Sequence, residues 1–548
     1  MSDWRHSFRR GLQASAQMAG LLSLLSFAAG KPAVAARSEE QVSKDFQRTV
    51  TLGAGQSVHI EHKFGEVRVH GESGRDVKIS ASIRVQASSK DEAESFAQKI
   101  QIDVQQSSDG VRIKTIYPEE ENRWFHFSRH SSWSVSYDIA MPSDAPLTVR
   151  NSFGSIEAAG IRGAEDLENS HGSVTVHDAG AVRLNNSFGS VELNGATGDV
   201  FVNDTNASVQ VFEVKGALEV RDRFGSITTK SIQGAATITG GNGTVTLSDA
   251  GSATIVTSFG SVDARNVRGD LTVRDNNGNI EVATIAGAAD LSNSFGNITL
   301  SDVHGRVNCK TNNGRVKGSN LAGSTVTIRD SFANIELETI NGALDAETSN
   351  GKITVRDARG SVTLKTSFGA IEASNIPRGI SAISSNASIS LADIGADAYA
   401  KTSFGSVLAE RVNGNLTVED SNGSVTARNI RGDARVNTSF SGVTLDAIGG
   451  RISVDNQNGA ISVTATRPSS GCKDISLKTS FSAIHVRIPE GLGYNLSAHT
   501  SFGRINSELP VTSTGSIGGD NLTGTIGNGG CQLQLTDSNG SIEISKAQ

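Results

Sequence analysis

Ser403-Phe404-Gly405-Ser406-Val407 recurs eighteen residues later, in a changed form, as Ser421-Asn422-Gly423-Ser424-Val425. The two phrases alternate from about residue 151 to 466. A repeat this short cannot be a domain and is too regular to be a loop, so each copy must be one coil of a stacked array. The second residue of one phrase is phenylalanine, at 153, 188, 224, 259, 295, 332, 368, 404 and 440. The second residue of the other is His171 and then asparagine, at 206, 242, 277, 313, 350, 386, 422 and 458.

The apolar residues within each coil follow the period of a β-strand. With the Phe or Asn counted as position zero, position +3 is Ile or Val in every coil from Ile156 to Ile461, and positions +5 and +8 are mostly apolar. The residues between them are mainly Ser, Thr, Asn and Glu, which is typical of a strand with one buried face. A corner near Gly at +10 leads to a second strand, such as residues 271–273.

These periods predict an all-β fold. We expect a single long parallel β-helix, or β-solenoid, made of about 18-residue coils with irregular N- and C-terminal caps. The general preference of strand crossovers favours a right-handed coil.

Position zero and the glycine that usually follows it form the expected tight corner, because Asn-Gly tolerates left-handed backbone angles. Two residues before this corner, most coils have a short polar side chain. Such side chains can bond backbone groups that a bend leaves unpaired, so we interpret the column as structural. It includes Asn151, Asn169, Asn186, Asp204, Asp222, Thr257, Asp275, Asn293, Thr311, Asp330 and Thr348.

The two ends of the chain depart from the repeat. Residues 1–35 have three arginines, then an apolar run, then Ala33-Val34-Ala35, which is the pattern of a cleaved signal peptide. Residues 36–150 are expected to form a capping section with a first coil at Phe64 and one helix near 89–100. Residues 151–466 would be the regular array, and residues 467–548 the closing coils. We therefore expect an extracytoplasmic protein: periplasmic, secreted or at the cell surface.

Charge narrows the range of partners. Without residues 1–35 the chain has 46 Lys and Arg against 56 Asp and Glu, a net charge of −10. Nucleic acid and anionic membrane surfaces both need a basic footprint, so we expect no nucleic acid partner. No second apolar span follows the first, and we expect no membrane insertion after signal cleavage.

No grouping of residues predicts catalysis, a cofactor or a metal. The acids of the +4 column stand in Phe coils, so a second coil should separate them. The aromatic and histidine-rich segment 124–133 is either a ligand or metal loop or a loop that packs its rings on the cap, and its spacing is not diagnostic of a metal. We expect a protein that is not an enzyme. The alternative is a carbohydrate-active enzyme, a polysaccharide lyase or hydrolase on a β-helix. The acids of the +4 column are Glu157, Glu192, Asp263, Glu336 and Glu372.

The three cysteines fit neither a disulfide scaffold nor a zinc site. Cys309 occupies a core position of its coil. Cys472 and Cys531 fall in nearly the same column, and export would permit a disulfide. The coil of Phe502 intervenes in the sequence, however, and two coil steps exceed the roughly 7 Å limit on Cα separation. A bond would require residues 503–530 to fold out or back, so both states of this pair stay open.

The pattern resembles the bacterial putative adhesin family, whose members are exported parallel β-solenoids of unknown function. The resemblance rests on the repeated Ser-Asn-Gly-x-Ile/Val phrase, on the early coil Phe64-Gly65-Glu66-Val67 interrupted by a helix, and on the closing phrase at residues 500–505. It covers nearly the whole mature chain, although phenylalanine in alternate coils and the number of coils depart from the plain pattern. It implies a non-catalytic structural or adhesive surface protein that presents a long repetitive face to polysaccharide, cell wall or another surface protein.

The phenylalanine column permits two interpretations that differ in function. Rings in alternate coils would form a line with a spacing of about 9.6 Å, twice the strand separation. If the rings turn inward, each fills a corner of the core. If they point outward, they make a binding stripe for sugar rings or a partner protein. Because soluble monomers rarely expose such a stripe, we expect inward packing. The candidate stripe is Phe188, Phe224, Phe259, Phe295, Phe332, Phe368 and Phe404.

Overall fold

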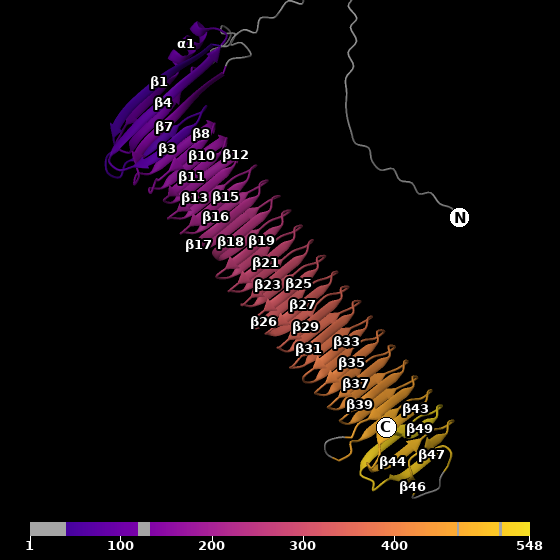
Figure 1. Ribbon diagram of the computed structural model, residues 1–548. Helices are drawn as coiled ribbons and strands as arrows, with labels where there is room; N and C mark the ends of the chain where they lie inside the picture. The colour runs from indigo at the N-terminus through magenta and orange to yellow at the C-terminus, as the bar shows by residue number, and fades with distance from the viewer. Residues whose placement is uncertain (1–39, 119–131, 468–470, 514–517, 548) are drawn as a thin grey trace, which may run out of the picture.

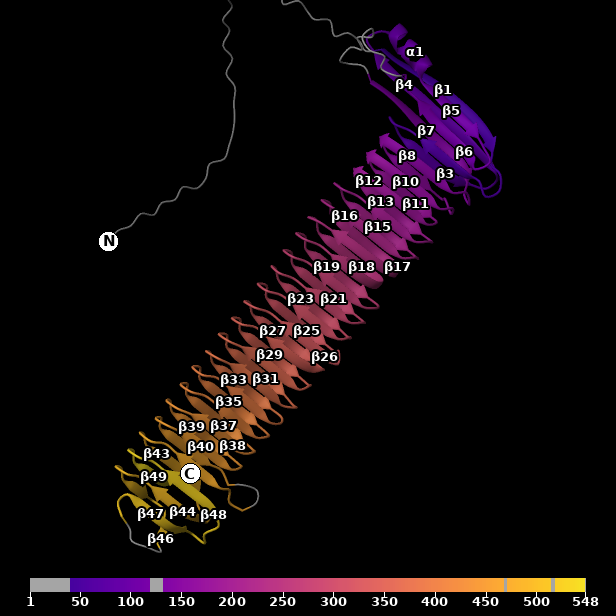
Figure 2. The same ribbon diagram turned by 180° about the vertical axis from the view of Figure 1, so that it is seen from behind.

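The computed structural model describes residues 40–118, 132–467, 471–513 and 518–547. The molecule is an elongated rod in which the strands run across the long axis (Figures 1 and 2). The expected signal peptide, residues 1–35, lies outside the described residues, as does most of the segment 124–133.

Each coil crosses the rod twice, and neighbouring coils pair in parallel, so the predicted parallel β-solenoid is confirmed. Strands that follow position zero form what we call the first sheet. Within it Ile371, for example, lies between Ile353 of the preceding coil and Ile389 of the next. The strands of the first sheet within the array are β9 (Ile156–Ala159), β11 (Val174–Ala179), β13 (Val191–Ala196), β15 (Val209–Val214), β19 (Val262–Val267), β21 (Ile280–Ile285), β23 (Ile298–Val303), β25 (Val316–Leu321), β27 (Ile335–Ile340), β29 (Ile353–Ala358), β31 (Ile371–Ile376), β33 (Ile389–Ile394), β35 (Val407–Val412), β37 (Val425–Ile430), β39 (Val443–Ile448) and β41 (Ile461–Ala465).

The return strands of the coils form the second sheet. Two long strands, β17 (Ile227–Gly240) and β18 (Val245–Val256), run through both sheets. The other strands of the second sheet within the array are β8 (Leu147–Phe153), β10 (Glu165–His171), β12 (Val182–Phe188), β14 (Val200–Asn203), β16 (Leu218–Asp222), β20 (Leu271–Arg274), β22 (Ala289–Ser292), β24 (Val307–Lys310), β26 (Thr325–Arg329), β28 (Ala343–Glu347), β30 (Val362–Thr366), β32 (Ile380–Ser384), β34 (Ala398–Lys401), β36 (Leu416–Glu419), β38 (Ala434–Thr438) and β40 (Ile452–Asn456).

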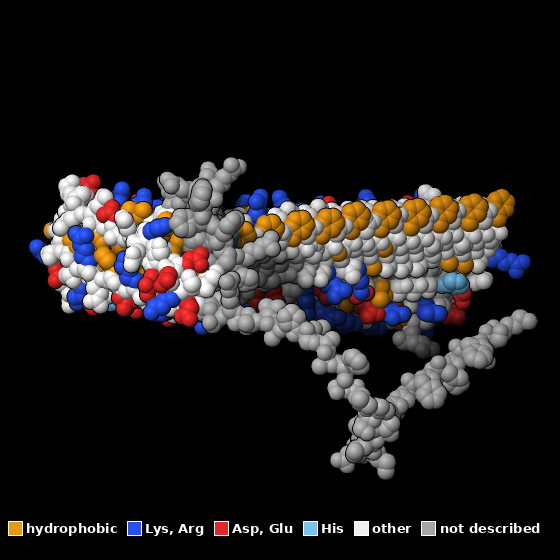
Figure 3. Space-filling model, turned by 90° about the horizontal axis from the view of Figure 1, so that it is seen from above, with side chains coloured by type: hydrophobic (Ala, Val, Ile, Leu, Met, Phe, Trp, Pro, Cys, Tyr) orange, Lys and Arg blue, Asp and Glu red, His pale blue; other side chains and the backbone are white. Residues whose placement is uncertain are grey.

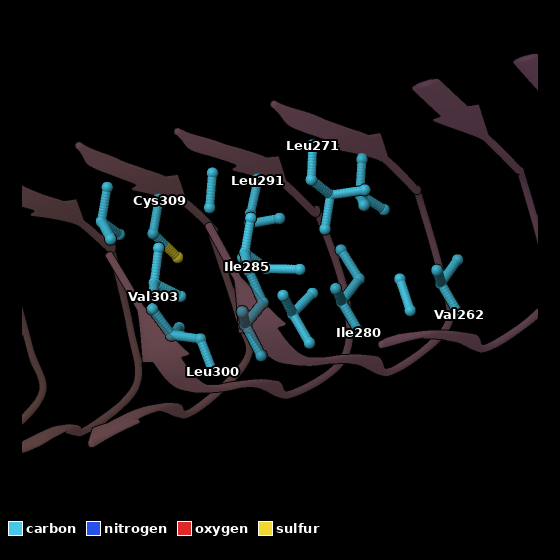
Figure 4. Packing of buried hydrophobic residues seen from close by; sticks show 14 of the residues in the cluster. Val262, Leu271, Ile280, Ile285, Leu291, Leu300, Val303 and Cys309 are labelled. Atoms are coloured by element: carbon cyan, nitrogen blue, oxygen red, sulfur yellow. The ribbon is translucent and has the colours of Figure 1, made fainter. Parts of the chain in front are cut away.

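The core is one continuous apolar layer between the two sheets. Every +3 side chain from Ile156 to Ile461 is buried, and the apolar side chains of the second sheet meet this column from the other side (Figure 4). Cys309 is fully buried among them, as its column predicted. Because each coil adds the same few apolar residues, the length of the rod is set by the number of coils.

The corner opposite position zero holds a backbone conformation that the sequence analysis missed. At position +7 the chain is left-handed in coil after coil, and the residue is usually not glycine. Asn and Asp, which tolerate this conformation best, recur there, for example Asn266 (φ 57°) and Asp302 (φ 54°), and that recurrence was the signal available in the sequence. We call this side of the rod the left-handed edge.

Thr284 is a β-branched residue held at φ 59° on this edge, where its side chain is exposed. A β-branched side chain is strained in this region, so Thr284→Gly is expected to raise the free energy of unfolding by about 1 kcal/mol. Thr272→Gly, in the extended strand β20, should instead lower it by a similar amount. Chemical denaturation of the two variants checks the prediction, and a loss of stability in both would contradict it.

The N-terminal section covers the first coil with an antiparallel sheet. Strands β2 (Ser57–Glu61) and β3 (Val67–Glu72) form a coil that pairs with β8 and β9 on one side. On the other side, it pairs with a coil of β6 (Gly110–Ile116) and β7 (Ser132–Pro142). Strand β7 also pairs antiparallel with β4 (Asp76–Ala87), β4 pairs antiparallel with β1 (Glu40–Thr51), and β5 (Gln101–Gln106) pairs antiparallel with β6. The predicted helix is α1 (Lys90–Lys99), capped by Ser89, whose hydroxyl accepts from the Glu92 N–H.

At the C-terminal end, the order of coils in space differs from their order in the sequence. The coil of β42 (Ile475–Lys478) and β43 (Ile484–Pro489) pairs with the last coil, β48 (Cys531–Thr536) and β49 (Ile542–Ala547). Only beyond that lies the coil of β44 (Tyr494–His499) and β45 (Ile505–Ser507). Strand β47 (Asn521–Ile526) pairs antiparallel with β44, and β46 (Val511–Ser513) pairs antiparallel with β47.

This exchange of order decides the state of the two outer cysteines. Because the coil of Phe502 does not intervene in space, Cys472 and Cys531 lie in adjacent coils with their Cα atoms 5.8 Å apart, and they form a disulfide. The segment after residue 503 does fold back, as bonding required.

Candidate functional site: the phenylalanine edge

The phenylalanine column lies on the edge where the chain passes from the second sheet to the first. Its rings point outward: the exposed fraction runs from 43% at Phe153 to 66% at Phe404, and it is 84% at Phe502. Figure 3 shows them as one line of apolar side chains along the rod. We call this row the phenylalanine edge: Phe153, Phe188, Phe224, Phe259, Phe295, Phe332, Phe368, Phe404, Phe440, Phe481 and Phe502.

The prediction that these rings turn inward is therefore wrong. The inside of the corner is already occupied by the buried polar side chain two residues earlier, such as Thr402 below Phe404. The chain bends immediately afterwards, so the alternation of the strand no longer carries position zero into the core. The seven rings of the candidate stripe all stand in the exposed row, from Phe188 to Phe404.

The polar column beneath the row holds each corner to the coil before it, as its residue types predicted. The amide of Asn169 donates to the carbonyls of Gly154 (3.0 Å) and Gly172 (2.9 Å). Thr402 donates to Ala387 O (3.1 Å) and accepts from Gly405 N–H (3.2 Å). These bonds fix the point at which each ring leaves the backbone.

The glycine after position zero is needed mainly because coils approach closely, not because of a left-handed backbone. At Gly369 a Cβ atom would lie 1.7 Å from the carbonyl oxygen of Gly351 in the preceding coil. The left-handed explanation from the sequence holds at some of these corners, for example Gly296 with φ 133°.

Between consecutive rings, the asparagine of the intervening coil bends back to the backbone. The amide of Asn422 donates to Ser403 O (3.0 Å), and Asn386 and Asn458 make the same bond to Ser367 O and Ser439 O (both 3.0 Å). The asparagine side chain is thus turned toward the preceding coil. We call the space above each such asparagine, between two phenylalanine rings, a slot.

The first slot of the row is filled by an aromatic ring of the chain itself. His171 takes the place of asparagine there, and its ring stacks at 4.6 Å on Phe153 and at 4.9 Å on Phe188, with interplanar angles of 15° and 12°. The stack continues to Phe64, 5.4 Å from Phe153. A slot is therefore wide enough for one aromatic ring in stacking contact with both neighbours.

At the C-terminal end, Phe and Asn coils do not alternate in the sequence, but they do alternate in the stack. In the chain, Phe481 is followed by Phe502 and then by Asn539. In the stack, Ile484 pairs with Ile542 and Ile542 with Ile505, so the coil of Asn539 lies between those of Phe481 and Phe502. The exchanged C-terminal coils thus extend the row by a further slot and ring.

At the surface, the residues that flank the row carry no acidic group, because the aspartates of the polar column are buried beneath it. From the coil of Phe153 onward, positions −1 to +2 contain no Asp or Glu in the described coils and are mostly Ser, Asn and Gly. The basic residues among them are Arg223, Arg315, Lys352 and Arg504. The side chains of Arg315 and Lys352 pair with Glu336 and Glu372, and the guanidinium of Arg223 lies 5.9 Å from the ring centre of Phe224. On a chain of net charge −7, this edge is an apolar line whose few charged neighbours are basic.

The left-handed edge, on the opposite side of the coil, is polar and shallowly grooved. Two grooves of about 650 and 740 Å³ follow the +7 and +9 columns, one around Asp393 and Arg411 and the other around Asp178 and Glu213. The Arg411 guanidinium bonds Asp393 at 2.6 and 3.0 Å and holds the pKa of that carboxyl below its ordinary value. Among the described residues, the carboxyls whose pKa is raised by burial line the interior, not these grooves: Glu165, Asp204, Asp222, Asp275, Asp330, Asp420 and Asp537.

The acidic +4 column is less regular than the sequence analysis assumed. Asp263 lies directly opposite Glu281 of the next coil, and Arg265 bridges the two with contacts of 2.6 Å to each. Glu157, Glu192, Glu336 and Glu372 stand on the outer face of the first sheet, apart from one another. Most acids of this column form exposed ion pairs, and such pairs contribute little to stability.

The aromatic segment 124–133 is described only from residue 132 onward. Trp133 packs against Phe64 (5.9 Å between centroids) and Phe96 of α1 (5.0 Å), in the cap. Among the described residues, no group of three or more His, Cys, Asp or Glu side chains is placed to hold a metal ion. No helix in the described ranges has the length and apolar character needed to cross a bilayer.

Comparison with known proteins finds one family and few relatives. No curated protein matches the chain. A solved structure with some similarity is that of a putative cell adhesion protein from Clostridium sporogenes, with 12% sequence identity, 41% of this chain and 99% of that chain covered, and a TM-score of 0.22. A likeness of this size carries no argument about this chain. Residues 261–404, however, match the Toastrack DUF4097 family, and this match confirms the resemblance to a bacterial β-solenoid family of unknown function.

Proposed function

We propose that this chain is a non-catalytic, extracytoplasmic surface protein that acts by presenting the phenylalanine edge as a long contact face. The observation that carries the proposal is the row of rings, each about half or more exposed, on a single line of the rod. A monomeric soluble protein rarely exposes an aligned apolar surface of this extent unless something binds it.

The architecture supports a role in contact. The coils hold the rings at a fixed pitch of about 9.6 Å on a stiff two-sheet rod, so a partner can engage several rings at once. The edge is apolar and has no acidic residue at positions −1 to +2, which suits a neutral polysaccharide or the apolar surface of another protein. No observation of the described residues favours the carbohydrate-active enzyme over this role. The carboxyls whose pKa is raised, as a general acid requires, lie in the interior and not in the grooves of the left-handed edge, and in one groove Arg411 lowers the pKa of Asp393.

Paired substitution of two neighbouring rings, Phe368→Ser with Phe404→Ser, tests the proposal. Because both rings are more than 60% exposed, the free energy of unfolding should change by less than about 1 kcal/mol per site. Retention on glycan arrays, on insoluble polysaccharide and on immobilised copies of the chain should fall at least tenfold wherever the native chain is retained.

Leu408→Ser is the matched control, because Leu408 is an exposed apolar residue on the outer face of the first sheet. It should leave retention unchanged. The proposal fails if the double variant is retained as well as the native chain on every surface that binds the native chain.

A further inference from the structure

We propose that the partner of the phenylalanine edge is a second copy of this chain, set antiparallel, with the rings of each copy in the slots of the other. This inference rests on the proposed function, and it names the partner of the same surface. Three features of the row support it: the size of the slots, the match of its repeat, and the area it exposes.

The width of a slot is known from the first one, which an aromatic ring of the chain fills. Where His171 fills the first slot, its ring lies 4.6 and 4.9 Å from the two phenylalanines. A ring from a second row, placed midway between rings about 9.6 Å apart, would lie about 4.8 Å from each, in the range of favourable aromatic pairs. The other slots from Asn206 to Asn539 have an asparagine at their floor, and no aromatic ring of the described residues stacks in them as His171 does in the first.

A second copy of this chain has the same spacing between rings, so it can match the row along its whole length. A partner with any other repeat would fall out of step after a few rings, whereas a second copy has the same pitch by construction. The exchanged C-terminal coils keep this pitch through Asn539 and Phe502, at the cost of a more complex chain path. Because positions −1 to +2 of the row carry no Asp or Glu, two negatively charged copies can also approach without surface acidic groups facing each other.

Two-fold symmetry then fixes the direction. A two-fold axis along the rod would place the rings of both copies at the same height, face to face, and the slots would stay empty. A two-fold axis across the rod can offset the rows by half a repeat, and it makes the copies antiparallel. Full overlap with this offset places the axis near the middle of the row from Phe188 to Phe502, about half a coil from Asn350, between that coil and the coil of a neighbouring phenylalanine.

The area of the row is sufficient for a stable dimer. A phenylalanine side chain can bury roughly 200 Å², and the rings from Phe188 to Phe502 are 52–84% exposed. Interleaving would bury on the order of 1,000 Å² on each copy and 2,000 Å² in total, which is the size of a standard specific interface. Antiparallel overlap is also the contact that two rods projecting from facing surfaces can make, so the row would serve self-recognition between such surfaces.

Sedimentation velocity of the full chain over a range of concentrations is the first test. We expect a reversible dimer, and we expect Phe332→Ser with Phe368→Ser, at the centre of the row, to raise its Kd by at least about 100-fold. Leu408→Ser should leave Kd unchanged. A monomer at every concentration overturns the inference, and so does an equal loss of affinity in the control.

Spin labels on introduced cysteines test the direction. Ser349→Cys and Thr205→Cys occupy the same column, one at the centre of the row and one near its end, and the native cysteines are buried or disulfide-bonded. In the antiparallel dimer, the labels at 349 should lie within about 30 Å of each other, and those at 205 roughly 70–80 Å apart. Short distances at both positions would show a parallel pair and overturn the arrangement. A monomeric chain that still loses polysaccharide retention on Phe→Ser substitution would refute self-association while leaving the proposed function in place.

Discussion

Ile371→Asp is expected to lower the free energy of unfolding by roughly 5 kcal/mol or more. Ile371 is fully buried, and its in-register neighbours Ile353 and Ile389 are fully buried too. The substitution removes the apolar contacts of one side chain and leaves a carboxyl group with no polar partner between two apolar neighbours. Burial should also raise the folded-state pKa of the new carboxyl well above its ordinary value, so the loss should grow as the pH rises above about 4.

Thr363→Asp is the matched control, because Thr363 lies on the outer face of β30, one residue after the buried Val362. Its in-register neighbours are Asp345 and Ser381. The new carboxylate would face Asp345 across one coil step, so a cost below about 1 kcal/mol is expected from like charges. Urea denaturation of both variants decides the matter, and equal stability of the two would contradict the buried column.

The regular array could be predicted from the sequence because every coil places apolar residues at the same positions. A column such as Ile371 must be apolar in each copy, so its period is visible many times over, and strand, register and burial follow from it. Cys309 and the helix cap at Ser89 were predictable for a similar reason, because their patterns are local.

The corners and the two ends of the rod were harder to predict, because they depend on the space inside the corner and on the order of coils in space. The repeat of apolar residues along the sequence gives no information on either. Whether Phe404 turns inward or outward depends on how much room the corner leaves beside Thr402, and residue types do not reveal this. The disulfide of Cys472 and Cys531 depends on an exchange of coil order, a non-local event. In both cases the sequence left two defined alternatives, and the structure distinguished them.

Glu165 is the one place in the described array where the apolar pattern of a column is broken by an acid with no partner. It lies in register between Leu147 and Val182, both buried, and its own exposed fraction is 2%. Neither carboxyl oxygen has a hydrogen-bond partner among the described residues. Burial raises the pKa of this carboxyl to about 8, from an ordinary value of 4.5.

The pH dependence that follows has a definite sign. The unfolded chain releases the Glu165 proton near pH 4.5, while the folded chain keeps it to about pH 8. The contribution of this carboxyl to the free energy of unfolding is therefore fully present below pH 4.5 and is lost as the pH rises to 8. The loss amounts to about 5 kcal/mol at most. His62 acts in the opposite direction at lower pH: burial lowers its pKa to about 4, so stability is lost as the pH falls from 6.5 toward 4. Measurements above pH 7 therefore isolate the contribution of Glu165 from that of His62.

Glu165→Leu is expected to stabilise the chain by several kcal/mol at pH 8, because it removes the ionisation penalty and restores the apolar column between Leu147 and Val182. The native chain should lose stability by roughly 1 kcal/mol per pH unit between pH 7 and 8, and this slope should vanish in the variant. Glu165→Gln separates the two effects, since it abolishes the slope but keeps an unpaired polar group in the core, so its gain at pH 8 should be smaller than that of leucine. Urea denaturation at pH 7, 8 and 9 provides the measurement. A slope that persists in both variants would show that the titrating group is not Glu165, and a leucine variant less stable than the native chain at pH 8 would show that the carboxyl has a partner that holds it in place.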